Sequence, residues 1–86
     1  MVIHMSETSF AVDPDLPTPV WEQVASHIAD QITDGLLKPG ARLPAEPALA
    51  MQYGVAHGTM RRVMEGLREQ ALVETRWGKG TYVLPT

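Results

Sequence analysis

Apolar residues recur along the chain with the period of amphipathic helices. The first apolar stripe consists of Val20, Val24, Ile28 and Ile32. These positions share one face at about 3.6 residues per turn. Thr18 and Pro19 predict the start of the helix, as N-cap and first helical residue, and Gly35 predicts its end. We therefore expect a first helix between Pro19 and Gly35 that packs through one face.

A second, shorter helix is predicted from Ala45 to Tyr53. Pro47 fits this helix only because proline is tolerated in the first turn, and Gly54 ends it. Its expected core residues are Ala48, Leu49 and Met51.

A third helix is predicted from His57 to Gln70. Its apolar face consists of Met60, Val63, Met64, Leu67 and Ala71. Its polar face consists of Gly58, Arg61, Arg62, Glu65 and Arg68. Gly58 is the expected N-cap, because Ala56 has no side-chain acceptor. Gly66 should cost this helix about 0.5–1 kcal/mol relative to alanine.

The last segment has the pattern of a β-hairpin. Residues 73–76 and 81–84 are strand-like, and Gly78 and Gly80 bracket Lys79 at the turn. Only about four residues join the second and third helices, which is typical of a helix-turn-helix. The predicted fold is mostly α with a small β-hairpin: a winged helix-turn-helix of three helices and a two-stranded antiparallel wing. It occupies residues 18–86, after a flexible tail over residues 1–17.

Composition narrows the classes of function. The chain has 86 residues and no cysteine, which indicates one small domain without disulfides. It lacks the roughly 20-residue apolar run of a membrane helix and the apolar stretch of a signal peptide, which favours the cytoplasm. It also lacks a catalytic triad and a metal-spaced Cys/His group, and Gly78–Thr81 lacks the spacing and following helix of a phosphate-binding loop. We expect no enzyme activity, no cofactor and no metal.

Charge is distributed unevenly along the chain. The net charge is −3, and the first 17 residues hold three acidic residues and no lysine or arginine. The remaining positions hold all seven basic residues and the other seven of the ten acidic ones, and five of the basic residues lie between positions 61 and 79. A helix with a basic face beside a basic ribbon suits a nucleic-acid backbone, whereas the negative total argues against indiscriminate DNA binding.

A series of short motifs runs through the chain in order. They are Trp21-Glu22-Gln23-Val24-Ala25, Ile32-Thr33-Asp34-Gly35-Leu36-Leu37-Lys38-Pro39-Gly40, Arg42-Leu43-Pro44-Ala45-Glu46, Leu49-Ala50, Tyr53-Gly54-Val55, Thr59 with Arg61, Leu72-Val73-Glu74, Arg76, and Gly78-Lys79-Gly80-Thr81-Tyr82-Val83. With these motifs, residues 20–84 resemble the N-terminal DNA-binding domain of GntR-type bacterial transcription regulators. The resemblance implies a third helix that enters the major groove and a wing that contacts the DNA backbone or minor groove.

The chain departs from the family pattern at four places. Ala45-Glu46-Pro47 replaces a usual Ser-Glu-Arg, and His57 replaces a second arginine that commonly contacts DNA. Arg62 stands where glutamate is frequent, and Ala71 stands where glycine is usual. The resemblance therefore implies the fold and DNA binding, but not a particular operator sequence.

The resemblance also implies a role in transcription regulation as a repressor, with two copies on an inverted-repeat operator. Members of the family usually carry a C-terminal effector-binding or dimerising domain. The match ends at Leu84 and the chain at Thr86, so no such domain fits. We expect either a domain excised from a longer regulator or an unusually short regulator.

Arg61 and Arg62 are the first candidate DNA contacts. They lie about 100° apart on a helix, so one can face the bases while the other meets a phosphate. The alternative is a solvated face on which Arg61 pairs with Glu65 at i,i+4. At the helix N-terminus, His57 either donates to a phosphate or a base edge, or is an exposed turn residue. Gly58 and Thr59 either bind a phosphate through backbone amides and a hydroxyl or serve ordinary capping.

The hairpin supplies the other candidates. Lys79 at its tip either contacts a phosphate, with Gly78 and Gly80 allowing close backbone approach, or is a lysine in an ordinary Gly-rich turn. Arg76 either contacts the DNA backbone or pairs with a neighbouring glutamate of the ribbon. Trp77 either lies against the sugar-phosphate backbone or packs on the base of the wing. Arg42 is a weaker phosphate candidate, with solvation as its alternative.

The predicted function is sequence-specific binding of double-stranded DNA by a GntR-type regulator. A winged-helix module that binds proteins instead is the alternative, and the missing family arginines and the acidic balance favour it a little. His27 is expected to be an ordinary surface residue. The residues expected to serve the core rather than chemistry are Trp21, Met51, Met60, Met64 and Tyr82.

Overall fold

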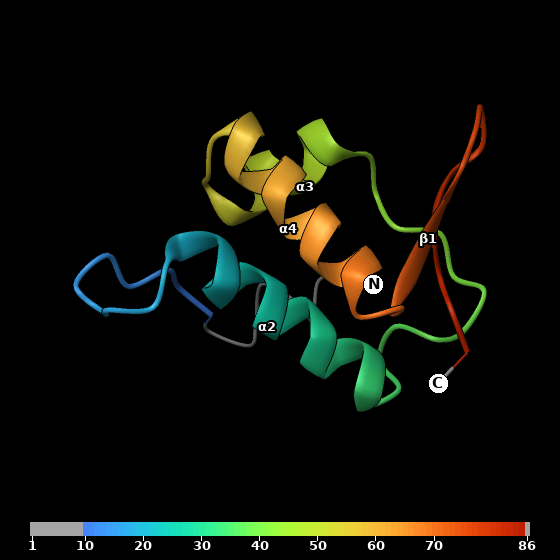
Figure 1. Cartoon of the computed structure of the whole chain (residues 1–86), viewed down its shortest axis with the longest axis horizontal. Coiled ribbons are helices and arrows are strands. Elements are labelled where there is room, and N and C mark those ends of the chain that lie inside the picture. The colour runs from blue at the N-terminus through green and yellow to red at the C-terminus, as the bar shows by residue number, and fades with distance from the viewer. Residues whose placement is uncertain (1–9, 86) are drawn as a thin grey trace.

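The computed structural model describes residues 10–85, so residues 1–9 of the predicted tail, and Thr86, lie outside the described part. In chain order the elements are helices α2 (Val20–Thr33), α3 (Glu46–Tyr53) and α4 (His57–Glu69) and strands β1 (Val73–Arg76) and β2 (Gly80–Val83). The helices pack around one another, and the two strands protrude beside them as a hairpin (Figure 1). This arrangement confirms the predicted winged helix-turn-helix.

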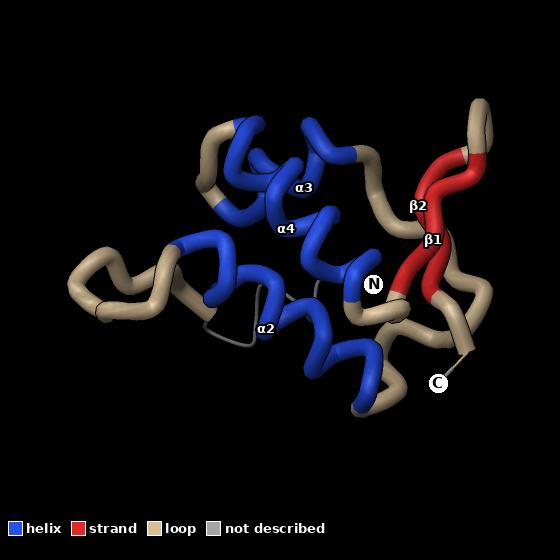
Figure 2. The backbone as a smooth tube through the Cα atoms, viewed as in Figure 1, coloured by secondary structure: helices blue, strands red, loops and turns tan. Residues whose placement is uncertain are grey.

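One hydrophobic core joins the three helices to the base of the hairpin. Its most completely buried side chains are Val24, Ile28, Leu49, Met60, Val63, Met64, Leu67 and Val83. The helical stripes predicted around Ile28 and Met64 therefore face the core, except for Ala71, which is exposed beyond the end of α4. They bring α2 and α4 into the most extensive contact between elements, and the two helices run side by side in Figure 2.

The start of α2 differs from the prediction. The helix begins at Val20 with Pro19 as N-cap, and no side chain caps it. Thr18 is therefore not the cap; its carbonyl accepts a hydrogen bond of 3.0 Å from Nε2 of Gln23, so a side chain from within the helix reaches back to this segment.

All three helices end on a residue in the left-handed conformation, and after α3 this residue is Gly54, as predicted, with a φ of 67°. Gly35 follows α2 with a φ of 84°, and the next amide donates to the carbonyl of Gln31 over 2.9 Å. Ala71 follows α4 with a φ of 59°, and the next amide donates to the carbonyl of Leu67 over 3.0 Å. Both patterns are Schellman endings; the first confirms the predicted role of Gly35, and the second uses alanine where glycine is favoured.

α3 is short and buries few positions. Pro47 lies in its first turn, as predicted, while Ala45, predicted as the first helical residue, is its N-cap. The prediction that Ala48 and Met51 belong to the core is wrong, because Ala48 is exposed and the side chain of Met51 is 82% exposed. Only Leu49 and Ala50 are buried in this helix. Residues 54–56 then connect α3 directly to α4.

The segment before α2 is attached to the helices. Phe10 stacks on His27 at a centroid distance of 4.2 Å and meets Tyr53 edge-on at 5.5 Å. Asp13 and Gln23 exchange two hydrogen bonds of 2.9 Å. Nδ1 of His27 lies 2.8 Å from the hydroxyl of Tyr53, so the prediction that His27 is an ordinary surface residue is wrong. The predicted tail is therefore attached to the helices through Phe10, Val12 and Asp13, while residues 14–17 are exposed.

The hairpin is antiparallel, with Val73 opposite Val83 and Arg76 opposite Gly80. The connection between α2 and α3 runs along its outer edge. The amide of Leu43 donates to the carbonyl of Thr81 over 2.8 Å, and the same connection forms an antiparallel bridge to Tyr82 through Arg42. This pairing holds the base of the wing against the helices and places Arg42 beside it.

Candidate nucleic-acid interface

The outer face of α4 presents exposed polar side chains. His57, Arg61 and Arg68 are all exposed, and their spacing places them along one side of the helix. Glu65 pairs with Arg62, so the alternative pair between Arg61 and Glu65 is not formed. Within residues 10–85, Arg61 is exposed and makes no ion pair.

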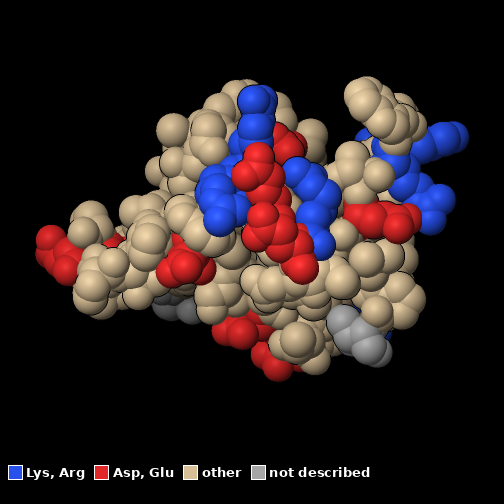
Figure 3. All heavy atoms as spheres, viewed as in Figure 1, with Lys and Arg blue, Asp and Glu red and all other residues tan. Residues whose placement is uncertain are grey.

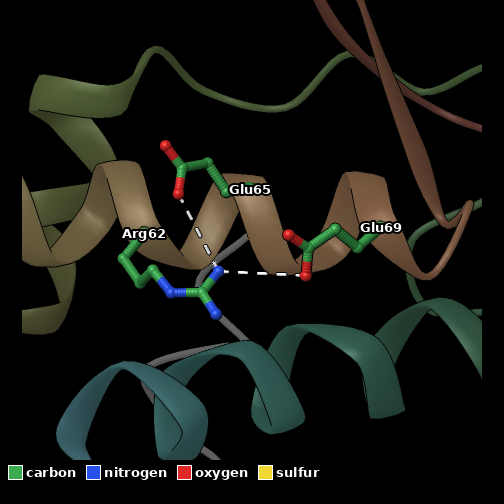
Figure 4. A network of polar contacts seen from close by, with 3 residues as sticks. All are labelled: Arg62, Glu65 and Glu69. Atoms are coloured by element: carbon green, nitrogen blue, oxygen red, sulfur yellow. Dashed lines mark ion pairs between the residues drawn. The ribbon is translucent and has the colours of Figure 1, made fainter.

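Arg62 is turned toward α2. Its guanidinium carbon lies 3.8 Å from the centroid of the Trp21 ring, and Nη1 lies 3.8 Å from Glu65 and 3.9 Å from Glu69. Figure 4 shows this side chain reaching from α4 toward the neighbouring helix. Arg62 thus helps to pack α4 on α2.

The N-terminus of α4 is open to solvent. Ala56 is the N-cap in an extended conformation, without a side-chain cap bond, so the prediction that Gly58 caps the helix is wrong. His57 and Gly58 are exposed and Thr59 is half-buried. No atom lies within 4 Å of a Cβ placed on Gly58. The first amides of a helix have no partner within it, so this end can receive an anion.

The wing tip is a tight turn with an exposed tryptophan. The amide of Lys79 donates to the carbonyl of Arg76 over 2.9 Å, and Gly78 adopts a φ of 70°, which glycine provides without strain. Trp77 is 98% exposed. The alternative in which Trp77 packs on the base of the wing is therefore excluded.

Two arginines flank the tip. Arg76 forms an ion pair with Glu74, as its alternative reading predicted, while its side chain stays 65% exposed. Arg42 packs over Gly80, where a Cβ would lie 2.7 Å from its Nε. The fold therefore brings a residue from before α3 onto the hairpin, and Figure 3 shows lysine and arginine side chains gathered over α4 and over the hairpin.

One polar contact between α4 and the wing was not predicted. Nη1 of Arg68 donates to Oγ1 of Thr75 over 3.0 Å, which links a residue of the polar face to β1. Helical spacing places Arg68 on that face without a partner, because it does not indicate how the hairpin turns back on the helix.

Other classes of site receive no support from the described part of the chain. Residues 10–85 contain no group of three or more His, Asp or Glu side chains that could hold a metal. No helix in that range has both the length and the apolar character needed to cross a membrane.

Sequence comparison identifies the family. The model of "Bacterial regulatory proteins, gntR family" matches residues 21–83. The chain is 45% identical over 65 residues to the mannosyl-D-glycerate transport/metabolism system repressor MngR of Escherichia coli K12, covering 76% of this chain and 27% of MngR. It is 31% identical over 72 residues to the transcriptional repressor YtrA of Bacillus subtilis, covering 84% of this chain and 55% of YtrA. The chain thus spans only part of the length of these relatives.

Solved structures share the fold. A transcriptional antiterminator from Listeria monocytogenes EGD-e has a TM-score of 0.84 at 26% identity, covering 90% of this chain and 57% of that protein. The DNA-binding domain of AraR in complex with operator ORX1 has a TM-score of 0.75 at 31% identity, covering 83% of this chain and 89% of that domain. The chain therefore belongs to the gntR family of bacterial regulatory proteins, as a winged helix-turn-helix DNA-binding domain.

Proposed function

We propose that this domain reads specific double-stranded DNA with α4 in the major groove and the wing tip on the adjacent backbone or minor groove. The observation that carries the proposal is the exposed Arg61 on the second helix of a helix-turn-helix, next to a basic, protruding wing. The AraR domain supports it, because a domain of the same fold is seen there on operator DNA.

Each candidate residue has a role that its position permits. Arg61 reads base edges, because a guanidinium can donate two hydrogen bonds to one guanine. The N-terminus of α4 meets a phosphate through backbone amides. The residues assigned to that phosphate are His57, Gly58 and Thr59. The residues assigned to the wing contact are Arg42, Arg76, Trp77, Gly78 and Lys79.

Two arginines that commonly contact DNA in the family are replaced in this chain. Pro47 and His57 stand at positions where the family commonly supplies an arginine, and Arg62 lies over Trp21. Arg61 and the wing therefore carry a larger share of the DNA contact than is usual in the family.

Two copies of the domain would bind an inverted repeat, because a two-fold protein arrangement matches two-fold related half-sites about one helical turn apart, roughly 34 Å. The names of MngR and YtrA as repressors favour repression, in which the bound protein occludes a promoter. Such a regulator would act in the bacterial cytoplasm.

The test is selection of duplexes from a random pool, followed by affinity measurements across salt concentration. Three to five phosphate contacts should give a log–log slope of roughly −3 to −4.5. Lys79→Gln should weaken the slope by about 0.9, whereas the matched Lys38→Gln, in the connection between α2 and α3, should leave it unchanged. If no duplex is bound at low salt, even by an artificially dimerised protein, the domain is a protein-binding module instead.

A further inference from the structure

A chain of three polar side chains connects α4 to both strands of the wing. Nη1 of Arg68 donates to Oγ1 of Thr75 over 3.0 Å. Oγ1 of Thr75 in turn lies 3.3 Å from Oγ1 of Thr81. Thr75 and Thr81 are directly opposite in the hairpin register, so the guanidinium on α4 is linked to β1 and β2 at one level.

This link lies above the buried base of the wing. Val73 and Val83 are each only 2% exposed and fix the base to the core. From Thr75 to Lys79 every residue is exposed, so apolar packing does not hold the outer half.

On β2, the amide of Leu43 donates to the carbonyl of Thr81 and Arg42 packs over Gly80. These contacts leave the side chains of β1 in the outer half unattached to the connection between α2 and α3. Within residues 10–85, the bond from Arg68 is the hydrogen bond that joins a side chain of α4 to that outer half.

The angle between α4 and the wing decides which DNA surfaces the domain can touch together. Arg68 lies seven residues after Arg61, which is two helical turns and about 10.5 Å farther along nearly the same face. A wing that swings on its base would separate Lys79 from the surface that Arg61 faces. Contact by both elements with one duplex requires the wing to keep its place.

We propose that Arg68 is a positioning residue that fixes the orientation of the wing relative to α4 through Thr75 and Thr81. In the free domain this bond limits the motion of the wing. On DNA, it lets Arg61 and Lys79 bind without first ordering the hairpin, because immobilising a flexible element on binding costs affinity. The planar guanidinium suits this role, since it can bond Thr75 through one N–H and retain its other donors.

The first experiment uses the free protein and so does not depend on the proposed function. Backbone ¹⁵N order parameters of residues 76–80 are compared in the wild type, Arg68→Met and Thr75→Val. Both variants should lower these values from the rigid range near about 0.85 toward the flexible range below about 0.6, with unchanged values in α4. Thr33→Val is the matched control on α2 and should leave the wing unaffected. Unchanged order parameters of residues 76–80 in both Arg68→Met and Thr75→Val would overturn the proposal.

The second experiment rests on the proposed function and uses a selected duplex. Arg68→Met and Thr75→Val should each weaken affinity roughly two- to tenfold, the range expected for one hydrogen bond. The affinity of the double variant should equal that of the single variant that binds less tightly, because both changes break the same link.

The outcomes separate the two proposals. If Thr75→Val binds like the wild type while Arg68→Met alone weakens binding and shifts the salt slope by about 0.9, Arg68 is only a phosphate contact and the positioning role fails. If the wild type binds no duplex, the proposed function fails, and the order parameters still decide the role of Arg68 in the wing.

Discussion

Gly66 of α4 and Trp21 of α2 are in direct contact: a Cβ on Gly66 would lie 2.9 Å from Cζ3 of the indole. Gly66 is buried and Trp21 is half-buried. The missing side chain at position 66 therefore lets the indole enter the interface between α2 and α4. The helix-propensity cost that the sequence indicates for Gly66 is offset by this packing.

Gly66→Ala should destabilise the domain although alanine is the better helix former. Overpacking against the indole should cost about 1–3 kcal/mol, which exceeds the gain of about 0.5–1 kcal/mol in helix propensity. Urea denaturation measures the difference. In a Trp21→Leu background the same change should be neutral or stabilising, and a wild-type background that tolerates alanine equally well would contradict this packing role.

Substitution of Arg61 should mainly weaken DNA binding, whereas substitution of Arg62 should mainly lower the stability of the fold. Arg61→Met should weaken binding to a selected duplex by about tenfold or more, as expected for a lost bidentate base contact, and leave unfolding unchanged. Arg62→Met should lower the stability by about 0.5–1 kcal/mol through the lost contact with Trp21. Affinity and thermal unfolding of both variants test this, and the opposite assignment of effects would reverse the two roles.

Ala71→Gly should stabilise the domain. Alanine in the left-handed conformation costs about 1–2 kcal/mol, and glycine removes that cost while losing about 0.4–1 kcal/mol through the greater freedom of the unfolded chain. The expected net gain is about 0.5–1 kcal/mol, seen as a higher midpoint in urea. Ala48→Gly, at an exposed position within α3, is the matched control and should lower the midpoint instead.

Periodicity predicted the helices because α2 and α4 are long enough to define an apolar face. α3 has only eight residues, and this length did not distinguish Leu49, which is buried, from Met51, which is exposed. Phe10 was missed for another reason: its partners His27 and Tyr53 are distant in sequence, and a single aromatic residue in a segment without periodicity carries no signal of what it contacts.

The candidate site, like the fold, was only partly predictable from the sequence. Spacing placed Arg61, Arg62 and Arg68 on one polar side of a helix, but it did not show that α2 would occupy Arg62 or that the hairpin would reach Arg68. Those outcomes depend on how the elements pack together. Trp77 remained ambiguous in the sequence because the same turn can fold an indole inward or leave it in solvent.

Stability should fall as the pH is lowered, through His27. Burial lowers the pKa of His27 below its ordinary value of 6.5, and the carboxylate of Asp30 opposes this with a smaller effect. The unfolded chain then binds the proton more readily than the folded domain, so stability is full above about pH 6.5 and declines as pH falls toward the folded pKa. Thermal unfolding at pH 7.5 and 5.5 should show a smaller decrease for His27→Gln than for the wild type. His57→Gln, at an exposed position, is the control and should keep the wild-type decrease.

Trp77 should contribute to DNA affinity without contributing to its salt dependence. The side chain is 98% exposed between Arg76 and Lys79, so apolar surface is held where the wing would meet a sugar or a base edge. Burial of such a side chain on DNA should be worth about tenfold or more in affinity. Because it neutralises no phosphate, Trp77→Ala should leave the log–log salt slope unchanged. Lys79→Gln should instead weaken the slope by about 0.9, which makes the two variants matched controls for each other. The intrinsic tryptophan fluorescence gives a second readout of Trp77, because a duplex that covers this side chain should protect it from acrylamide quenching.

Two results together would contradict a DNA contact by Trp77: wild-type affinity in Trp77→Ala, and fluorescence that stays unprotected in the complex. They would show that the indole stays in solvent when DNA is bound.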